Sequence, residues 1–197
     1  MRTATVLIIL AGLVGPAWAD LDDSNAYTDG GGVTWSGTKT LANDGLRADV
    51  EWLVNDRVLH GGELQFEYAY QLTIPAEATK AVLKFSVGML DSNEAQDIGS
   101  YQIDVGDIAP SDAFFGGPPP DLDTANWTFG GDGLLAGDVT YALNYWSVNE
   151  PQWGLASLHD SGTIAGGILP SPSDEIPEPA TLCLLAAGLI PALRRRR

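Results

Sequence analysis

The chain has 197 residues, which suffices for one ordinary domain with targeting segments and leaves little room for a second domain. Hydrophobic residues make up 45%, so a core can form, and a formal net charge of −16 at pH 7 argues against a protein that neutralises nucleic-acid phosphates. The single cysteine excludes a disulfide framework within the chain and a cysteine-rich metal site.

The N-terminus has the pattern of an export signal. Arg2 provides a positive charge, and an uncharged apolar run follows over residues 4–14. Two small residues, Ala17 and Ala19, then stand on either side of Trp18 at the A-x-A positions that signal peptidase requires. The apolar run is shorter than the roughly 20 residues that a spanning helix needs. We therefore expect residues 1–19 to be a signal peptide, signal peptidase to cut before Asp20, and the mature protein to lie outside the cytoplasm.

Between the two ends, apolar and polar residues alternate with a period of two, which is typical of strands with one buried and one solvated face. The clearest stretch is 64–74, where every even-numbered residue is apolar or aromatic, and the turn His60-Gly61-Gly62 precedes it. Other strands are expected at 33–38, 46–54, 81–89, 101–105, 127–129, 139–145 and 152–158. We predict an all-β domain over residues 20–169, an antiparallel β-sandwich of jelly-roll or immunoglobulin-like type.

Residues with catalytic potential are few. His60 and His159 are the only histidines, and Asp160 and Ser161 are such close sequence neighbours of His159 that their side chains should diverge. The motifs G-x-S-x-G, Walker A, G-x-G-x-x-G and H-E-x-x-H are absent. Paired carboxylates can hydrolyse glycosides, but nothing singles out one pair among 26 acidic residues. We predict a protein without catalytic residues, with a secreted glycan hydrolase as the weaker alternative.

Calcium is the one cofactor that the composition favours, because hard cations bind clustered oxygen atoms. Acidic clusters occur at residues 20–25, 91–97, 104–107 and 121–123. None follows the order of an EF-hand loop, and an acidic surface also keeps an exported protein soluble. No metal ligand is therefore assigned and no cofactor is predicted, with a structural calcium ion as the alternative.

Aromatic residues offer a second binding chemistry, because tryptophan and tyrosine rings can stack on sugar rings. Most of them lie on the apolar stripes and are expected in the core: Trp52, Tyr68, Tyr70, Tyr141 and Tyr145. Three others are less constrained by the alternation: Trp127, Trp146 and Trp153. These three are the candidates for an exposed patch of the kind that a carbohydrate-binding module carries.

The C-terminus combines a linker, an apolar segment and a basic end. A Pro/Ser-rich linker is expected over residues 170–176, because such a sequence does not pack. Pro177, Glu178 and Pro179 follow, and Pro179 suits the first turn of a helix. The apolar run 180–193 would then form a short transmembrane helix of about 21 Å. Four arginines end the chain and should stay on the cytoplasmic side of the membrane: Arg194, Arg195, Arg196 and Arg197.

This three-part end resembles the PEP-CTERM sorting signal of Gram-negative bacteria. The resemblance covers residues 177–197 and includes the Pro-Glu-Pro motif, the apolar segment and the basic tail in that order. It implies recognition by an exosortase, a membrane-embedded transpeptidase-like enzyme that would cut near the motif and release the domain or attach it at the cell surface. Proteins with this signal typically accompany exopolysaccharide and biofilm systems. The alternative is a plain tail anchor.

These features together predict an exported protein of the cell surface or extracellular matrix, held transiently in the membrane by its C-terminus. The expected partners are signal peptidase, an exosortase, the membrane and an exopolysaccharide, and nucleic acid is not among them. The alternative function is a carbohydrate-binding module, with or without the help of calcium.

Overall fold

The structure is a computed structural model, and it describes residues 21–89, 95–116 and 124–172. In those residues a 3₁₀ turn, η1 (Asp23–Asn25), precedes ten β-strands, so the prediction of an all-β domain is confirmed. The first five strands are β1 (Ser36–Asn43), β2 (Leu46–His60), β3 (Glu63–Thr73), β4 (Lys84–Gly88) and β5 (Ala95–Tyr101). The others are β6 (Asp112–Phe115), β7 (Thr124–Thr128), β8 (Ala142–Ser147), β9 (Pro151–His159) and β10 (Ile164–Pro172).

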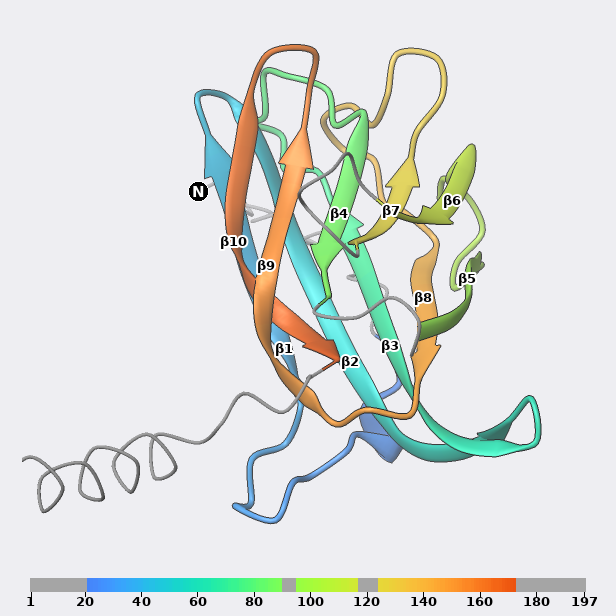
Figure 1. The fold of residues 1–197 in the computed structure, drawn as a ribbon. Coiled ribbons are helices and arrows are strands. Elements are labelled where there is room, and N and C mark those ends of the chain that lie inside the picture. The colour runs from blue at the N-terminus through green and yellow to red at the C-terminus, as the bar shows by residue number, and fades with distance from the viewer. Residues whose placement is uncertain (1–20, 90–94, 117–123, 173–197) are drawn as a thin grey trace, which may run out of the picture.

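The strands form two antiparallel five-stranded sheets that lie face to face (Figure 1). Sheet 1 has the order β1-β2-β3-β8-β5, and sheet 2 has the order β10-β9-β4-β7-β6. The chain changes sheet between β3 and β4, β4 and β5, β5 and β6, β7 and β8, and β8 and β9. This two-layer arrangement of alternating strands is that of a β-sandwich.

Inward-facing aliphatic and aromatic side chains fill the space between the sheets. Three buried tyrosines, here called the tyrosine cluster, lie among them: Tyr68, Tyr70 and Tyr145. The Tyr70 hydroxyl donates to the carbonyl of Pro170 in β10 and lies 3.1 Å from the Tyr145 hydroxyl, so Tyr145 donates to Tyr70. Burial raises the pKa of all three phenols, which therefore stay protonated at ordinary pH.

The outer face of sheet 1 is less exposed than the alternation predicts. In β3 the even-numbered residues from 66 onward face the core as expected, but Ala69 and Gln71 on the other face are buried as well. A second, smaller hydrophobic cluster lies on this outer face: Leu21, Leu53, Ala69 and Ala142. The N-terminal segment, through Leu21, thus covers part of a sheet face that the sequence pattern marks as solvated.

Two features of the strand prediction are wrong. The stretch 101–105 is not a strand, because β5 ends at Tyr101 and a turn follows in which the Asp104 N–H donates to the Asp107 carboxylate. Val105 is fully exposed in this turn, although its spacing suggested a buried stripe. The alternation also does not reveal β6, which has only four residues, or β10, which contains two glycines and two prolines.

β10 also corrects the start of the predicted linker. The residues at 170–172, expected to begin a linker over 170–176, are buried and pair with β9. Prolines are tolerated there because β10 is the edge strand of sheet 2, where one side of the backbone needs no ladder hydrogen bonds. The Pro170 carbonyl is moreover the acceptor for Tyr70. Residues 173–176 and the predicted signal at 177–197 lie outside the described residues.

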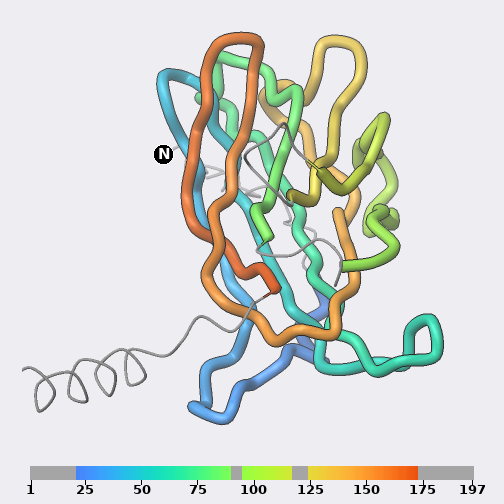
Figure 2. Tube along the Cα trace, in the orientation of Figure 1, coloured from blue at the N-terminus to red at the C-terminus, as the bar shows by residue number. Residues whose placement is uncertain are grey.

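β2 and β3 form a long hairpin that extends past the end of both sheets (Figure 2). Gly61 and Gly62 make its turn with φ angles of 59° and 95°, so the predicted turn is confirmed at residues that tolerate positive φ. The strand register shifts between Asn55 and Val58, which is a bulge that bends the hairpin. Asn55 is therefore the last regularly paired residue of β2 before the hairpin leaves the body.

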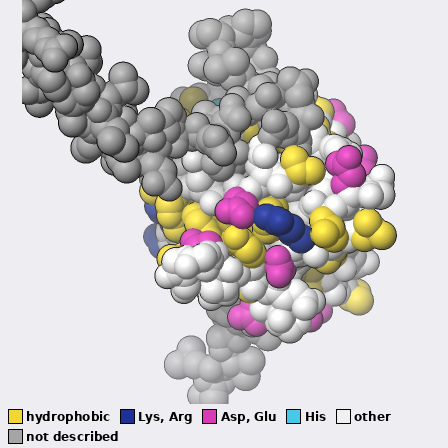
Figure 3. Space-filling view, turned by 60° about the horizontal axis from the view of Figure 1, so that its bottom comes forward, with side chains coloured by type: hydrophobic (Ala, Val, Ile, Leu, Met, Phe, Trp, Pro, Cys, Tyr) yellow, Lys and Arg dark blue, Asp and Glu magenta, His cyan; other side chains and the backbone are white. Residues whose placement is uncertain are grey.

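Surface ion pairs remove only part of the acidic character. On the face that Figure 3 shows, a small group of basic side chains lies between acidic ones. Three bases of the folded body pair with carboxylates within 3.1 Å: Arg47 with Glu77, Arg57 with Glu150, and Lys80 with Asp44. Exposed pairs of this kind contribute about 0–1 kcal/mol each. These ion pairs therefore contribute little to stability. They neutralise a few carboxylates, and the surface stays strongly negative.

Candidate functional site

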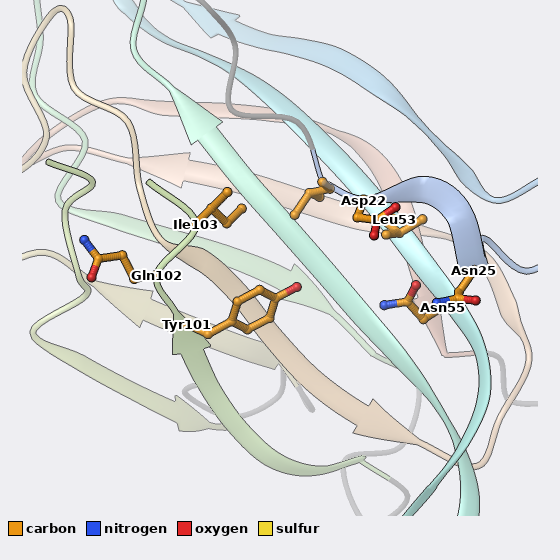
Figure 4. A pocket seen from close by; sticks show the side chains of 8 residues that line it. Asp22, Asn25, Leu53, Asn55, Tyr101, Gln102 and Ile103 are labelled. Carbon is orange, nitrogen blue, oxygen red and sulfur yellow. The ribbon is translucent and has the colours of Figure 1, made fainter. Parts of the chain in front are cut away.

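An open hollow of about 300 Å³ lies on the outer face of sheet 1, between the N-terminal segment and the end of β5 (Figure 4). We call it the Tyr101 hollow. Its lining consists of Leu21, Asp22, Asn25, Leu53, Asn55, Tyr101, Gln102 and Ile103. Leu21 and Leu53 belong to the second hydrophobic cluster and give the hollow a small apolar floor. The polar lining brings a carboxylate, three side-chain amides and a phenol to one place.

A hydrogen-bond network across three strands holds Asn55 in position. Glu67 in β3 accepts a hydrogen bond of 2.9 Å from the Asn55 amide in β2 and one of 2.8 Å from the Asn144 amide in β8. Because the NH₂ group of Asn55 points at this carboxylate, its side-chain carbonyl is turned away from Glu67. Glu67 therefore fixes which polar atom Asn55 presents to the hollow.

Tyr101 closes the opposite side of the hollow. Its side chain is 41% exposed, and Figure 4 shows its hydroxyl pointing across the hollow toward Asp22 and Asn55. Partial burial and the nearby charge of Glu67 raise the pKa of Tyr101 to about 12, so the hydroxyl can donate at ordinary pH. A hydrogen bond from the Ser24 backbone N–H lowers the pKa of Asp22, which stays an acceptor. The hollow thus combines a lasting donor with a lasting acceptor.

Two further hollows continue along the same face. One, of about 120 Å³, is lined by Leu21, Asp23, Ser36, Gly37, Thr38, Glu51, Trp52 and Leu53. The other, of about 390 Å³, is lined by Thr38, Lys39, Thr40 and Asp49. The first of these shares Leu21 and Leu53 with the Tyr101 hollow, and the two share Thr38 with each other. The three hollows therefore lie next to one another along β1 and β2, and together we call them the outer groove.

His60 contributes to a packed surface cluster. Its ring stacks on Trp146 of β8 with 4.3 Å between the ring centroids, and its Nε2 lies 2.7 Å from the Asp97 carboxylate. Asp97 itself adopts a φ of 48° at the register shift of β5. Because His60 covers one face of the Trp146 ring, this tryptophan is used in internal packing more than as an open stacking platform.

The second histidine lies on the outer face of sheet 2. The Nε2 atom of His159 is 2.8 Å from the Ser157 hydroxyl. The two residues are two positions apart on β9, so their side chains lie on the same face of the strand. No sequence motif indicated this pair. Burial and the charge of Lys84 lower the pKa of His159, so its ring is neutral at pH 7. Ser161 donates to Asp160 instead, so the neighbouring Ser and Asp are not brought to His159. Within the described hydrogen bonds His159 has no carboxylate partner of the kind that a catalytic triad needs.

Of the tryptophans predicted to form an exposed patch, Trp153 is exposed and Trp127 is not. Trp127 is fully buried and donates to a backbone carbonyl of β5 at 2.8 Å. Trp153 is 51% exposed and packs against Trp35 and Trp52, with ring centroids 5.2 and 6.0 Å apart. The core assignment is confirmed for Trp52 and for the tyrosine cluster, whereas Tyr141 is only half-buried.

The acidic clusters that suggested calcium are used locally where the structure describes them. Asp22 accepts from a backbone N–H of η1, and Asp107 accepts from the Asp104 N–H. In the described ranges no three His, Cys, Asp or Glu side chains are grouped so that they could hold a metal ion. Residues 121–123 and 91–94 lie outside those ranges, and calcium binding stays a prediction.

The residues predicted for targeting lie outside the described part of the chain. They are Ala17, Ala19 and Asp20 at the cleavage site, Pro177, Glu178 and Pro179 in the motif, and Arg194, Arg195, Arg196 and Arg197 at the end. In the part that is described, we find no helix with both the length and the apolar character needed to span a bilayer. Comparisons with protein-family models, curated proteins and solved structures gave no match. The functional assignment therefore rests on this chain's own residues.

Proposed function

We propose that this chain is an exported protein of the cell surface or extracellular matrix, sorted by a C-terminal PEP-CTERM signal and without catalytic activity. In this proposal signal peptidase removes residues 1–19, and residues 180–197 hold the chain in the membrane until an exosortase cuts near Pro177 to Pro179. The delivered domain then resides in a matrix that contains an exopolysaccharide.

The position of the core between the two sequence signals supports this proposal. Leu21, the second residue of the expected mature chain, is buried, and β10 pairs with β9 through Pro172, ahead of the Pro-Glu-Pro motif. The core between the sheets is assembled from residues 35–169. A body that completes its core within these limits can fold after export, with both signals removed.

The strand order supports a jelly roll more than an immunoglobulin-like domain as the finer fold type. Strands β3, β8 and β5 are neighbours in one sheet, and β9, β4 and β7 are neighbours in the other. The chain therefore alternates between the sheets at β3, β4 and β5 and again at β7, β8 and β9, as it does in the paired Greek keys of a jelly roll.

Mass spectrometry of the protein's C-terminus, taken from the cell surface of its producer, tests the sorting proposal. We expect the last peptide to end near Pro177 to Pro179. A variant with Pro177→Ala and Pro179→Ala should keep its terminal arginines, whereas Pro110→Ala, in a loop of the body, should be processed normally. Surface-exposed protein that still ends at Arg197 would show that the segment is a plain tail anchor.

A carbohydrate-binding module is the second candidate, and the outer groove favours it. Sugar hydroxyls both donate and accept hydrogen bonds, so a site for them needs both kinds of partner. The Tyr101 hollow supplies a phenol donor, a carboxylate acceptor and three amides around an apolar floor. Affinity electrophoresis in gels that contain the producer's polysaccharide tests this function, and unretarded migration would exclude it.

A further inference from the structure

The outer groove runs along the outer face of sheet 1, over β2 and over β1, the edge strand of that sheet. Its lining includes β2 residues from Asp49 to Asn55, a distance of about 20 Å at roughly 3.3 Å per residue. β2 is paired with β1 on one side and β3 on the other, so its backbone groups are already used within the sheet. At β2 a ligand in the groove is therefore contacted by side chains, and not by the strand addition through which extended peptides often bind.

The side chains of the groove can form the hydrogen bonds that a polyhydroxylated ligand requires. Hydroxyl groups come from Ser36, Thr38, Thr40 and Tyr101, and amide groups come from Asn25, Asn55 and Gln102. These groups donate and accept in the same way as sugar hydroxyls. The apolar floor at Leu21 and Leu53 suits the C–H faces of sugar rings, and Tyr101 stands at the exposed end of the groove.

The charge of the groove selects among such ligands. Four carboxylates line the three hollows: Asp22, Asp23, Asp49 and Glu51. Among the described residues that line them, Lys39 is the one basic side chain. Because like charges repel and the groove is concave, an anionic ligand such as a uronate chain is disfavoured, whereas a protonated amine is attracted.

We propose that the outer groove binds a linear glycan without acidic groups, and that free amino groups on the sugars strengthen the binding. This inference deepens the carbohydrate-binding candidate and rests on it. Asn55 and Tyr101 are the residues that contact the glycan from opposite sides of the Tyr101 hollow, and the carboxylates of Asp49 and Glu51 contact it farther along β2.

Isothermal titration calorimetry on the purified full chain in detergent tests the proposal with three hexasaccharides. They are the fully deacetylated chitosan hexamer, its N-acetylated counterpart and a hexamer of galacturonate, compared at mildly acidic pH, where the amines are protonated and the carboxylates ionised. We expect the deacetylated hexamer to bind most tightly, the acetylated one more weakly and the galacturonate hexamer not at all. The advantage of the deacetylated hexamer should shrink as salt rises from about 0.05 to 0.5 M.

Substitutions locate the site. Tyr101→Ala and Asn55→Ala should each weaken binding by about tenfold or more, because each removes a polar contact. Thr128→Ala, on the outer face of sheet 2, is the matched control and should bind like the parent. Melting curves of the variants show whether each is folded. Because Tyr101 is partly exposed, we expect Tyr101→Ala to disturb folding less than Asn55→Ala.

The possible results separate the two levels of the proposal. If the galacturonate hexamer binds as tightly as the deacetylated one, the charge selection is overturned while the carbohydrate-binding candidate stands. If none of the three binds to folded protein, the glycan specificity proposed for the outer groove is overturned, and affinity electrophoresis with the producer's polysaccharide decides the carbohydrate-binding candidate separately. If both groove variants bind like the parent, the outer groove is not the site. None of these results bears on sorting, which the cleavage near Pro177 decides.

Discussion

The Tyr70 hydroxyl links the core to the end of β10, and Tyr70→Phe tests this link. The substitution leaves the Pro170 carbonyl without its donor and the Tyr145 hydroxyl without its acceptor, both in the buried interior. A buried polar group that loses its partner costs about 1–3 kcal/mol, so for these two groups we expect a loss of about 2–6 kcal/mol in the free energy of unfolding. For a domain of this size that corresponds to a fall in Tm of roughly 4–24 °C.

Urea unfolding followed by tryptophan fluorescence measures this loss. Tyr101→Phe is the matched control, because it removes a hydroxyl from a 41%-exposed residue and should change stability by no more than about 0.5 kcal/mol. If Tyr70→Phe is as stable as this control, Pro170 is not held by the core. The chain would then leave the sheet earlier, and the sequence-based boundary of the linker at residue 170 would be right.

Two further predictions concern the core. Stability should fall as pH rises above about 10, because burial raises the pKa of the tyrosine cluster and the unfolded chain then releases protons that the folded chain retains. Three such phenols give a slope of roughly 4 kcal/mol per pH unit, and urea unfolding curves with no loss above pH 10 would contradict the burial. Gly37→Ala should destabilise by about 1–3 kcal/mol, because its Cβ would lie 2.9 Å from the Trp52 ring. Gly166→Ala, whose Cβ meets nothing closer than 3.8 Å, is the control, and equal melting temperatures would refute the crowding.

The alternation located strands best where one face packs into the core. It found β2 and β3 within a few residues of their observed starts, because their inward residues bury large side chains at every second position. It missed β10 for a physical reason. An edge strand with glycine and proline has the same local composition as a linker, and only tertiary contacts distinguish the two: the pairing with β9 and the contact of Pro170 with Tyr70, 100 residues away in sequence.

The outer groove was beyond sequence reasoning because its walls come from separate parts of the chain. The N-terminal segment, β1, β2 and the residues after β5 meet only through the pairing of the sheet. One local signal was present. Leu53 and Ala69 are apolar at positions where the alternation calls for polar residues, and both are buried. Apolar residues on the solvated side of two neighbouring strands indicate a covered outer face, and that cover is Leu21.

The same leucine connects the two proposals. Leu21 is 4% exposed and forms part of the wall that two hollows of the groove share. Cleavage before Asp20 would place the new N-terminus one residue away, with its Cα about 3.8 Å from that of Leu21. If signal peptidase cuts there, the residue that starts the mature chain is thus the direct neighbour of a residue that lines the proposed glycan site, and export and binding share this point of the chain.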